Sequence, residues 1–182
     1  LQTNGGMFRP LDVRCPEGTV FTAKRPAPTS TYWESGGFAI DLVWKALAPH
    51  LPDRLPAGSF LSVCATILSA RHPETDELAL LVEPLLGGWG AGCDKDGENG
   101  QFCPGNGQTY NIPIEVTERR YPVRVLRYAF HNADGGAGRF RGSKGVTLEY
   151  EILSEEASLT AIFGRNRFRS WGADGGEGGS AN

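Results

Sequence analysis

Residues 132–145 read Asn-Ala-Asp-Gly-Gly-Ala-Gly-Arg-Phe-Arg-Gly-Ser-Lys-Gly, a run that holds five of the chain's 25 glycines and three cations. The segment before it, residues 123–130, has the composition of a strand. In the segment after it, Val146, Leu148, Tyr150 and Ile152 alternate with polar residues, which is the period-two pattern of a half-buried strand. The sequence therefore predicts a glycine-rich loop that joins two strands.

This first glycine-rich loop has two interpretations. It is either a long hairpin turn with solvated cations, or an anion-binding or interface loop formed by Arg139, Arg141, Lys144 and Asp134. The second interpretation rests on glycine, which lets a ligand or a second backbone approach closely, and on backbone amides that converge with the cations. The loop is not a phosphate loop of the Walker type, because its serine precedes its lysine.

A second glycine-rich loop is predicted over residues 86–111, with Trp89, Asp94 and Asp96 as candidate site residues. Loops this long in a compact domain are usually functional or form an interface. The segment that begins at Asp94 does not match a calcium-binding loop of the EF-hand type. Its sixth and twelfth positions are asparagine and glycine, where that motif requires glycine and glutamate. Cys93 and Cys103 leave three alternatives open: half of a zinc site, a disulfide, or two free thiols, the last being the default.

The rest of the chain adds one main helix and further strands. Ile40, Val43, Trp44 and Leu47 form one apolar stripe of a helix over residues 35–48, which predicts that Asp41 pairs on the opposite face with the lysine four residues later. Strands are predicted over residues 8–13, 19–21, 59–69, 77–83 and 157–163, and the glycine-rich tail is expected to be weakly structured. The fold class is α+β: a β-rich mixed domain with largely antiparallel strands, one main amphipathic helix and two long glycine-rich loops.

The length, net charge and cysteine content of the chain indicate its domain number and exclude several classes of partner. A chain of 182 residues suffices for a single domain over 1–182, and its net charge of −3 argues against nucleic acid or an anionic membrane as partner. No apolar run approaches the roughly 20 residues that span a bilayer. Four cysteines are too few for a disulfide scaffold, so we expect a cytoplasmic protein. Both termini read as loop interiors, which predicts a piece of a longer chain.

Familiar catalytic motifs are absent from the sequence. It has no Gly-x-Ser-x-Gly elbow, no His-Glu-x-x-His and no dinucleotide fingerprint, and its three histidines have no metal-ligand spacing. The residues alone therefore assign neither catalytic groups nor a metal ligand to this chain.

A family resemblance runs in order along the whole chain. Its segments are Asn4-Gly5-Gly6-Met7-Phe8-Arg9-Pro10-Leu11, Pro16-Glu17-Gly18-Thr19, Gly87-Gly88-Trp89-Gly90-Ala91, Asp96-Gly97, residues 111–118, Tyr121-Pro122, residues 134–142 with Gly145-Val146, and Trp171-Gly172-Ala173-Asp174-Gly175-Gly176. These segments resemble the B-type subunit of the hydantoinase/oxoprolinase family, which includes N-methylhydantoinase B, the C-terminal half of 5-oxoprolinase, and the alpha subunits of acetone and acetophenone carboxylases.

The resemblance implies that residues 1–182 are the C-terminal portion of a longer B-type subunit. It also implies an ATP-dependent hydrolase that acts on a small cyclic amide together with an ATP-binding A-type subunit. It implies a divalent metal and ATP in the whole enzyme, neither bound by this fragment alone, and a fragment that is inactive without the remainder of its own subunit. One departure concerns residues 100–103, Gly-Gln-Phe-Cys, where relatives are expected to carry histidines. Two alternatives follow: a fragment of a ketone carboxylase alpha-type subunit, and a non-catalytic assembly domain of such a complex.

Overall fold

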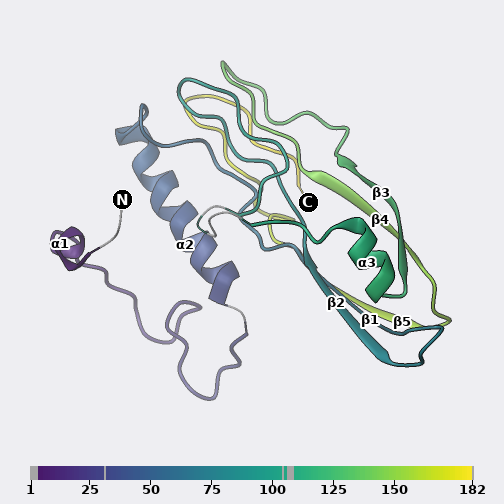
Figure 1. The fold of residues 1–182 in the computed structure, drawn as a ribbon. Helices are drawn as coiled ribbons and strands as arrows, with labels where there is room; N and C mark the ends of the chain where they lie inside the picture. Colours follow the sequence, from purple (N-terminus) through teal and green to yellow (C-terminus); the bar gives the residue numbers. More distant parts are fainter. Residues whose placement is uncertain (1–3, 31, 104, 106–108, 182) are drawn as a thin grey trace.

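The computed structural model describes residues 4–30, 32–103, 105 and 109–181. Two antiparallel sheets form its centre (Figure 1). The larger sheet has the order β2-β1-β5, in which β1 (Ala65–Arg71) pairs with both β2 (Leu78–Pro84) and β5 (Ala157–Ile162). The smaller sheet pairs β3 (Val123–Phe130) with β4 (Val146–Ile152). The predicted α+β class is confirmed, and so is the prediction that residues 132–145 join two strands.

The core lies between the two sheets. Leu68 and Leu81 face each other across β1 and β2, and both pack with Val123 of β3. Tyr150 of β4 closes the same cluster, and its hydroxyl donates a hydrogen bond to the buried carboxylate of Glu83. Burial and that carboxylate raise the pKa of Tyr150. The contact of Leu68 and Leu81 with Val123 therefore joins the larger sheet to the smaller one.

In the part of the chain that the structure describes, three short helices and one long helix accompany the sheets. They are α1 (Gly5–Phe8), α2 (Tyr32–Leu47), the 3-10 turn Ala48–His50 and α3 (Ile114–Arg120). The predicted helix over 35–48 is thus confirmed with an earlier start. The predicted short strands near the N-terminus are wrong, because residues 9–30 form turns and coil after α1. Helix α3 was not predicted from the sequence; it begins directly after Pro113, its N-cap residue, which has no side-chain group to cap it.

The predicted buried strand over 59–69 is correct only in its second half. Residues 59–64 are buried but irregular, because Leu61 and Cys64 have φ angles of 44° and 48° in the left-handed region. A strand cannot continue through such angles. The segment is held instead by Glu34 of α2, whose Oε1 accepts hydrogen bonds from Ser62 Oγ and Val63 N, both at 2.8 Å.

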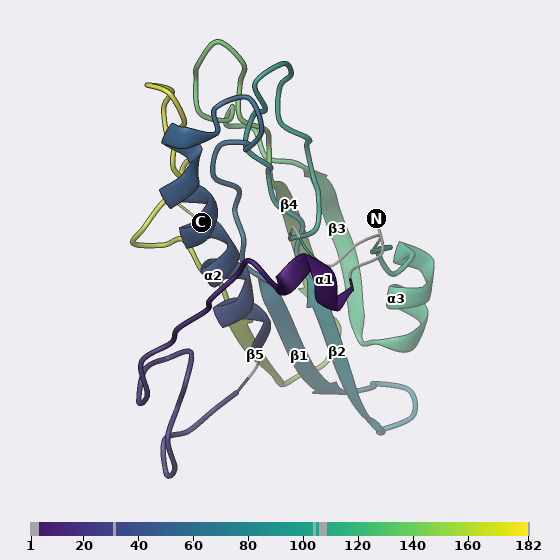
Figure 2. The same ribbon diagram turned by 90° about the vertical axis from the view of Figure 1, so that its left-hand side faces the viewer.

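The glycine-rich segments gather at one end of the sheets. The loops around residues 86–101 and 132–145 and the C-terminal tail lie side by side above the strands in both views (Figures 1 and 2). Within the described ranges, no helix combines the length and apolar character that crossing a bilayer requires.

Candidate functional site

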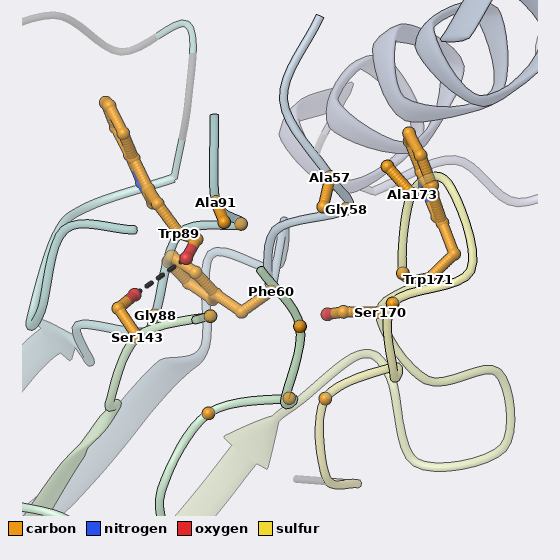
Figure 3. A pocket seen from close by; sticks show the side chains of 18 of the residues that line it. Ala57, Gly58, Phe60, Gly88, Trp89, Ala91, Ser143, Ser170, Trp171 and Ala173 are labelled. Atoms are coloured by element: carbon orange, nitrogen blue, oxygen red, sulfur yellow. Dashed lines mark hydrogen bonds between the residues drawn. The ribbon is translucent and has the colours of Figure 1, made fainter. Parts of the chain in front are cut away.

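The two predicted glycine-rich loops bind each other through their backbones. Trp89 O accepts hydrogen bonds from Ser143 N at 3.2 Å and from Ser143 Oγ at 2.7 Å (Figure 3). Asp96 Oδ1 accepts one from Arg141 N at 2.7 Å, and Gly97 N donates to Arg141 O at 2.9 Å. The loops, 45 residues apart in the sequence at the Asp96–Arg141 contact, therefore form one unit rather than two solvated turns.

Close backbone approach explains the glycines of this unit. A Cβ atom at Gly97 would lie 2.0 Å from the carbonyl oxygen of Trp89. A Cβ atom at Gly135 would lie 2.1 Å from both the carbonyl carbon and oxygen of Gly142. No side chain fits at such distances, so only glycine lets these backbones meet.

The C-terminal tail forms the third part of the unit. Gly58 N donates to Trp171 O at 2.9 Å, and Ser170 Oγ donates to Ser59 O at 2.9 Å. Further along, Glu177 N donates to the carbonyl of Ala137, in the first loop, at 2.8 Å. The expectation of a weakly structured tail is therefore wrong: the tail has no regular element among its described residues, but its backbone is held by specific partners.

A buried ion pair joins the tail to α2. Asp41 Oδ2 lies 2.7 Å from Arg165 Nη2, and both side chains are buried, with 4% and 6% of their surfaces exposed. Asp41 Oδ1 accepts a hydrogen bond from Trp171 Nε1 at 2.9 Å, and Arg165 Nε donates to Phe60 O at 3.1 Å. The predicted pairing of Asp41 with Lys45 on a solvent-exposed face is wrong, because the partner comes from 124 residues away.

A cavity of about 1070 Å³ lies among these segments. Figure 3 shows Trp89 and Ser143 on one side of it, Trp171 and Ala173 on the other, and the chain at Ala57 between them. Glycine is the commonest residue of the lining, so peptide groups supply much of its polar surface. The volume is at the upper end of the range of small-molecule sites. The arrangement can therefore take a small ligand that exchanges hydrogen bonds with backbone groups.

The structure separates the seven predicted site residues into two groups. Asp134, Arg139, Lys144 and Trp89 line the cavity, whereas Arg141, Asp94 and Asp96 are not among its lining residues. The indole of Trp89 donates to Phe102 O at 2.8 Å, which fixes its ring. Sequence reasoning missed Ser170 and Trp171, and the only signal for them was the Trp-Gly-Ala-Asp-Gly-Gly motif of the tail.

Two of the three predicted cations of the first loop share one carboxylate. Lys144 Nζ lies 3.1 Å from Asp134 Oδ1, and Arg141 Nη1 lies 3.8 Å from the same oxygen. The hydrogen bond from Lys144 and the charges of Lys144 and Arg141 hold the pKa of the exposed Asp134 carboxyl below its usual value. The Arg139 guanidinium lies over the ring of Phe140, 5.4 Å from its centroid. The interpretation of this loop as an anion site remains a prediction.

The cysteines and acidic residues are the candidate metal ligands of this chain. Cys93 and Cys103 are free thiols, the first exposed and the second buried, as in the default interpretation. Among the residues that the structure describes, no group of three or more histidine, cysteine, aspartate or glutamate side chains could hold a metal ion. These residues do not fit the divalent metal that the family implies, and we derive no step through it.

Sequence comparison identifies relatives of this chain. The family model of hydantoinase B/oxoprolinase matches residues 1–182. The B subunit of a putative D-/L-hydantoinase from Pseudomonas sp. strain NS671 is 32% identical, over 97% of this chain and 29% of that protein. The beta subunit of the caprolactamase from Pseudomonas jessenii is 31% identical, over 90% of this chain and 29% of that protein.

A solved structure shares the fold. The nucleotide-free structure of acetone carboxylase, described under ATP-dependent acetone carboxylation, matches with a TM-score of 0.67 over 82% of this chain and 21% of that chain, at 18% identity. This chain spans about three tenths of the length of the two relatives named above. The family model covers every residue, and the chain belongs to the hydantoinase B/oxoprolinase family.

Proposed function

We propose that this chain is part of an ATP-dependent cyclic-amide hydrolase, and that its glycine-lined cavity forms one wall of the substrate site. The observation that carries the proposal is the match of the whole chain to the hydantoinase B/oxoprolinase family. The relatives are named after hydantoin and caprolactam, and both molecules are cyclic amides.

The chemistry of the cavity supports this substrate class. Hydantoin and caprolactam are small and neutral, and each presents at least one carbonyl acceptor and one N–H donor. A lining rich in peptide groups offers the complementary donors and acceptors, and indole rings such as that of Trp171 cover the apolar part of a ring.

The role of this chain is to bind and orient the substrate. Its backbones are locked at contact distance by glycines such as Gly97, so the wall is preorganised before a ligand enters. We assign the catalytic groups, the divalent metal and the ATP to the remainder of the B-type polypeptide and to an A-type partner. Both relatives carry the word "subunit" in their names, which supports a partnered complex.

Reconstitution tests the proposed reaction. The complete gene product is combined with its A-type partner and supplied with hydantoin, 5-oxoproline or caprolactam. Ring-opened product is expected only when ATP and a divalent metal are both present. Turnover without ATP would refute the proposal.

A ketone carboxylase is the second candidate, because the solved neighbour is an acetone carboxylase. The same mixture then receives acetone or acetophenone with and without bicarbonate. Carboxylated product that requires bicarbonate would favour this alternative. The third interpretation, an assembly domain, predicts that Arg139→Ala and Arg141→Ala prevent complex formation but leave the turnover of the assembled complex unchanged.

A further inference from the structure

Helix α2 turns several of its apolar residues outward and two of its carboxylates inward. Ile40, Val43 and Leu47, spaced i, i+3 and i+7, are 39%, 56% and 41% exposed. On the opposite side, Glu34 accepts a hydrogen bond from Val63 N, and Asp41 is only 2% exposed. A surface helix of a globular protein normally turns its apolar stripe to the core. We call Ile40, Val43 and Leu47 the outer stripe.

The orientation of α2 is fixed by the buried ion pair. Turning the outer stripe inward would carry Asp41 away from Arg165 and from the indole of Trp171. Breaking a buried pair of this kind is strongly destabilising, because one charge is left buried without its partner. The helix therefore cannot rotate to bury the outer stripe in the core of this chain, and the stripe remains exposed unless another polypeptide covers it.

The chain as a whole exposes far more surface than a closed domain. Its accessible surface is 12789 Å². A compact monomer of 19.6 kDa is expected to expose about 8,600 Å². The excess is roughly 4,200 Å², several times the ~800 Å² that one partner contributes to a standard interface. Exposed apolar residues on the N-terminal segment, among them Phe8, Leu11 and Val13, contribute to it.

We propose that the outer stripe of α2 is a docking surface for the part of a hydantoinase B-type subunit that this chain does not span. Two observations favour this occupant over a second copy of the chain. The relatives carry about 70% of their length outside the matched region, and that length must pack against something. A standard dimer contact would also cover only a fraction of the excess surface. The occupant presents apolar side chains to the stripe.

Cysteine labelling of the complete gene product tests the proposal. In a background with Cys15→Ser and Cys93→Ser, which removes the two exposed thiols of this region, a single Val43→Cys is compared with Leu42→Cys. Leu42 is as exposed as Val43, at 57% against 56%, but the adjacent position on a helix points in a different direction. Labelling at position 43 is expected to be at least tenfold slower than at position 42. A parallel pair, Val43→Asp and Leu42→Asp, is expected to lower the yield of folded protein only at position 43.

Equal labelling rates at the two positions would overturn the proposal. Protection at position 43 that disappears on dilution, together with a dimer mass, would also overturn it, because a second copy would then be the occupant. The labelling variants keep the test decisive if Val43→Asp fails to fold. The proposal depends on family membership and the geometry of α2, not on the proposed reaction, so its outcome is independent of whether the complex hydrolyses a cyclic amide.

Discussion

Removing the carboxylate of Asp41 is expected to destabilise the protein severely. In Asp41→Ala, the Arg165 guanidinium stays buried against Phe60 O and over the ring of Phe38, 5.0 Å from its centroid, without a counter-charge. Leaving one charge of a buried pair uncompensated costs about 3–5 kcal/mol. For a protein of this size, about 2–4 °C of Tm are lost per kcal/mol, so the expected fall is roughly 6–20 °C.

Thermal and urea unfolding measure this effect. The matched control is Glu149→Ala, which removes an exposed partner of Arg127 at 3.6 Å and is expected to cost at most about 1 kcal/mol. Replacing both members of the buried pair, Asp41→Leu with Arg165→Met, is expected to recover much of the loss, because apolar residues of similar volume need no counter-charge. The reasoning would be refuted if the free energy of unfolding of Asp41→Ala lay within about 1 kcal/mol of the wild type, well below the loss expected for a broken buried pair.

Three further outcomes are expected. Gly97→Ala, which places a Cβ 2.0 Å from a carbonyl oxygen, should lower Tm and disrupt the contact between the two loops, whereas Gly92→Ala, with its nearest neighbour at 3.4 Å, should be close to neutral in the same unfolding assay. A thiol reagent at pH 8 should modify only Cys15 and Cys93 in the folded protein, and rapid reaction of all four thiols would contradict the described burial. Burial raises the pKa of Cys64 from 9.0 to about 11. Between pH 9 and pH 11 the Cys64 thiol is therefore protonated in the folded state but ionised in the unfolded state. The contribution of this thiol to the free energy of unfolding should be complete below pH 9 and should fall by about 2–3 kcal/mol as the pH rises to 11. In Cys64→Ala the free energy of unfolding should fall less between pH 9 and pH 11, and the same fall as in the wild type would contradict the role of Cys64.

The local pattern of the sequence predicted four strands closely, at residues 78–84, 123–130, 146–152 and 157–162, but failed near the N-terminus and at residues 59–64. In β4, Tyr150 packs in the core as the alternation predicts, whereas Ile152 at the end of the strand is 37% exposed. Position 82 illustrates the limit of such patterns: Val82 of β2 is 50% exposed although its strand reads as apolar on both sides. Periodicity reports which residues avoid water, but not which polypeptide covers them.

Long-range partners account for most of what the sequence did not predict. Asp41 appears on a helical wheel as an exposed charge, and only the approach of Arg165, 124 residues later, makes it a core residue. The tail is similar, since its glycines suggest disorder until Trp171 and Gly58 are seen to bind each other. The two glycine-rich loops were predicted as candidate sites separately, and their mutual contact depends on close backbone distances that no local pattern encodes.

The glycine-lined cavity links this fold to the proposed reaction. Amide hydrogen exchange of the complete complex, with and without a cyclic-amide substrate and without ATP to prevent turnover, tests its role directly. Substrate is predicted to slow exchange in residues 133–145 and 170–179, which contribute to the cavity lining, and to leave the α3 region unchanged. Slowed exchange confined to other parts of the complex, with these two segments unaffected, would contradict a substrate site at this wall.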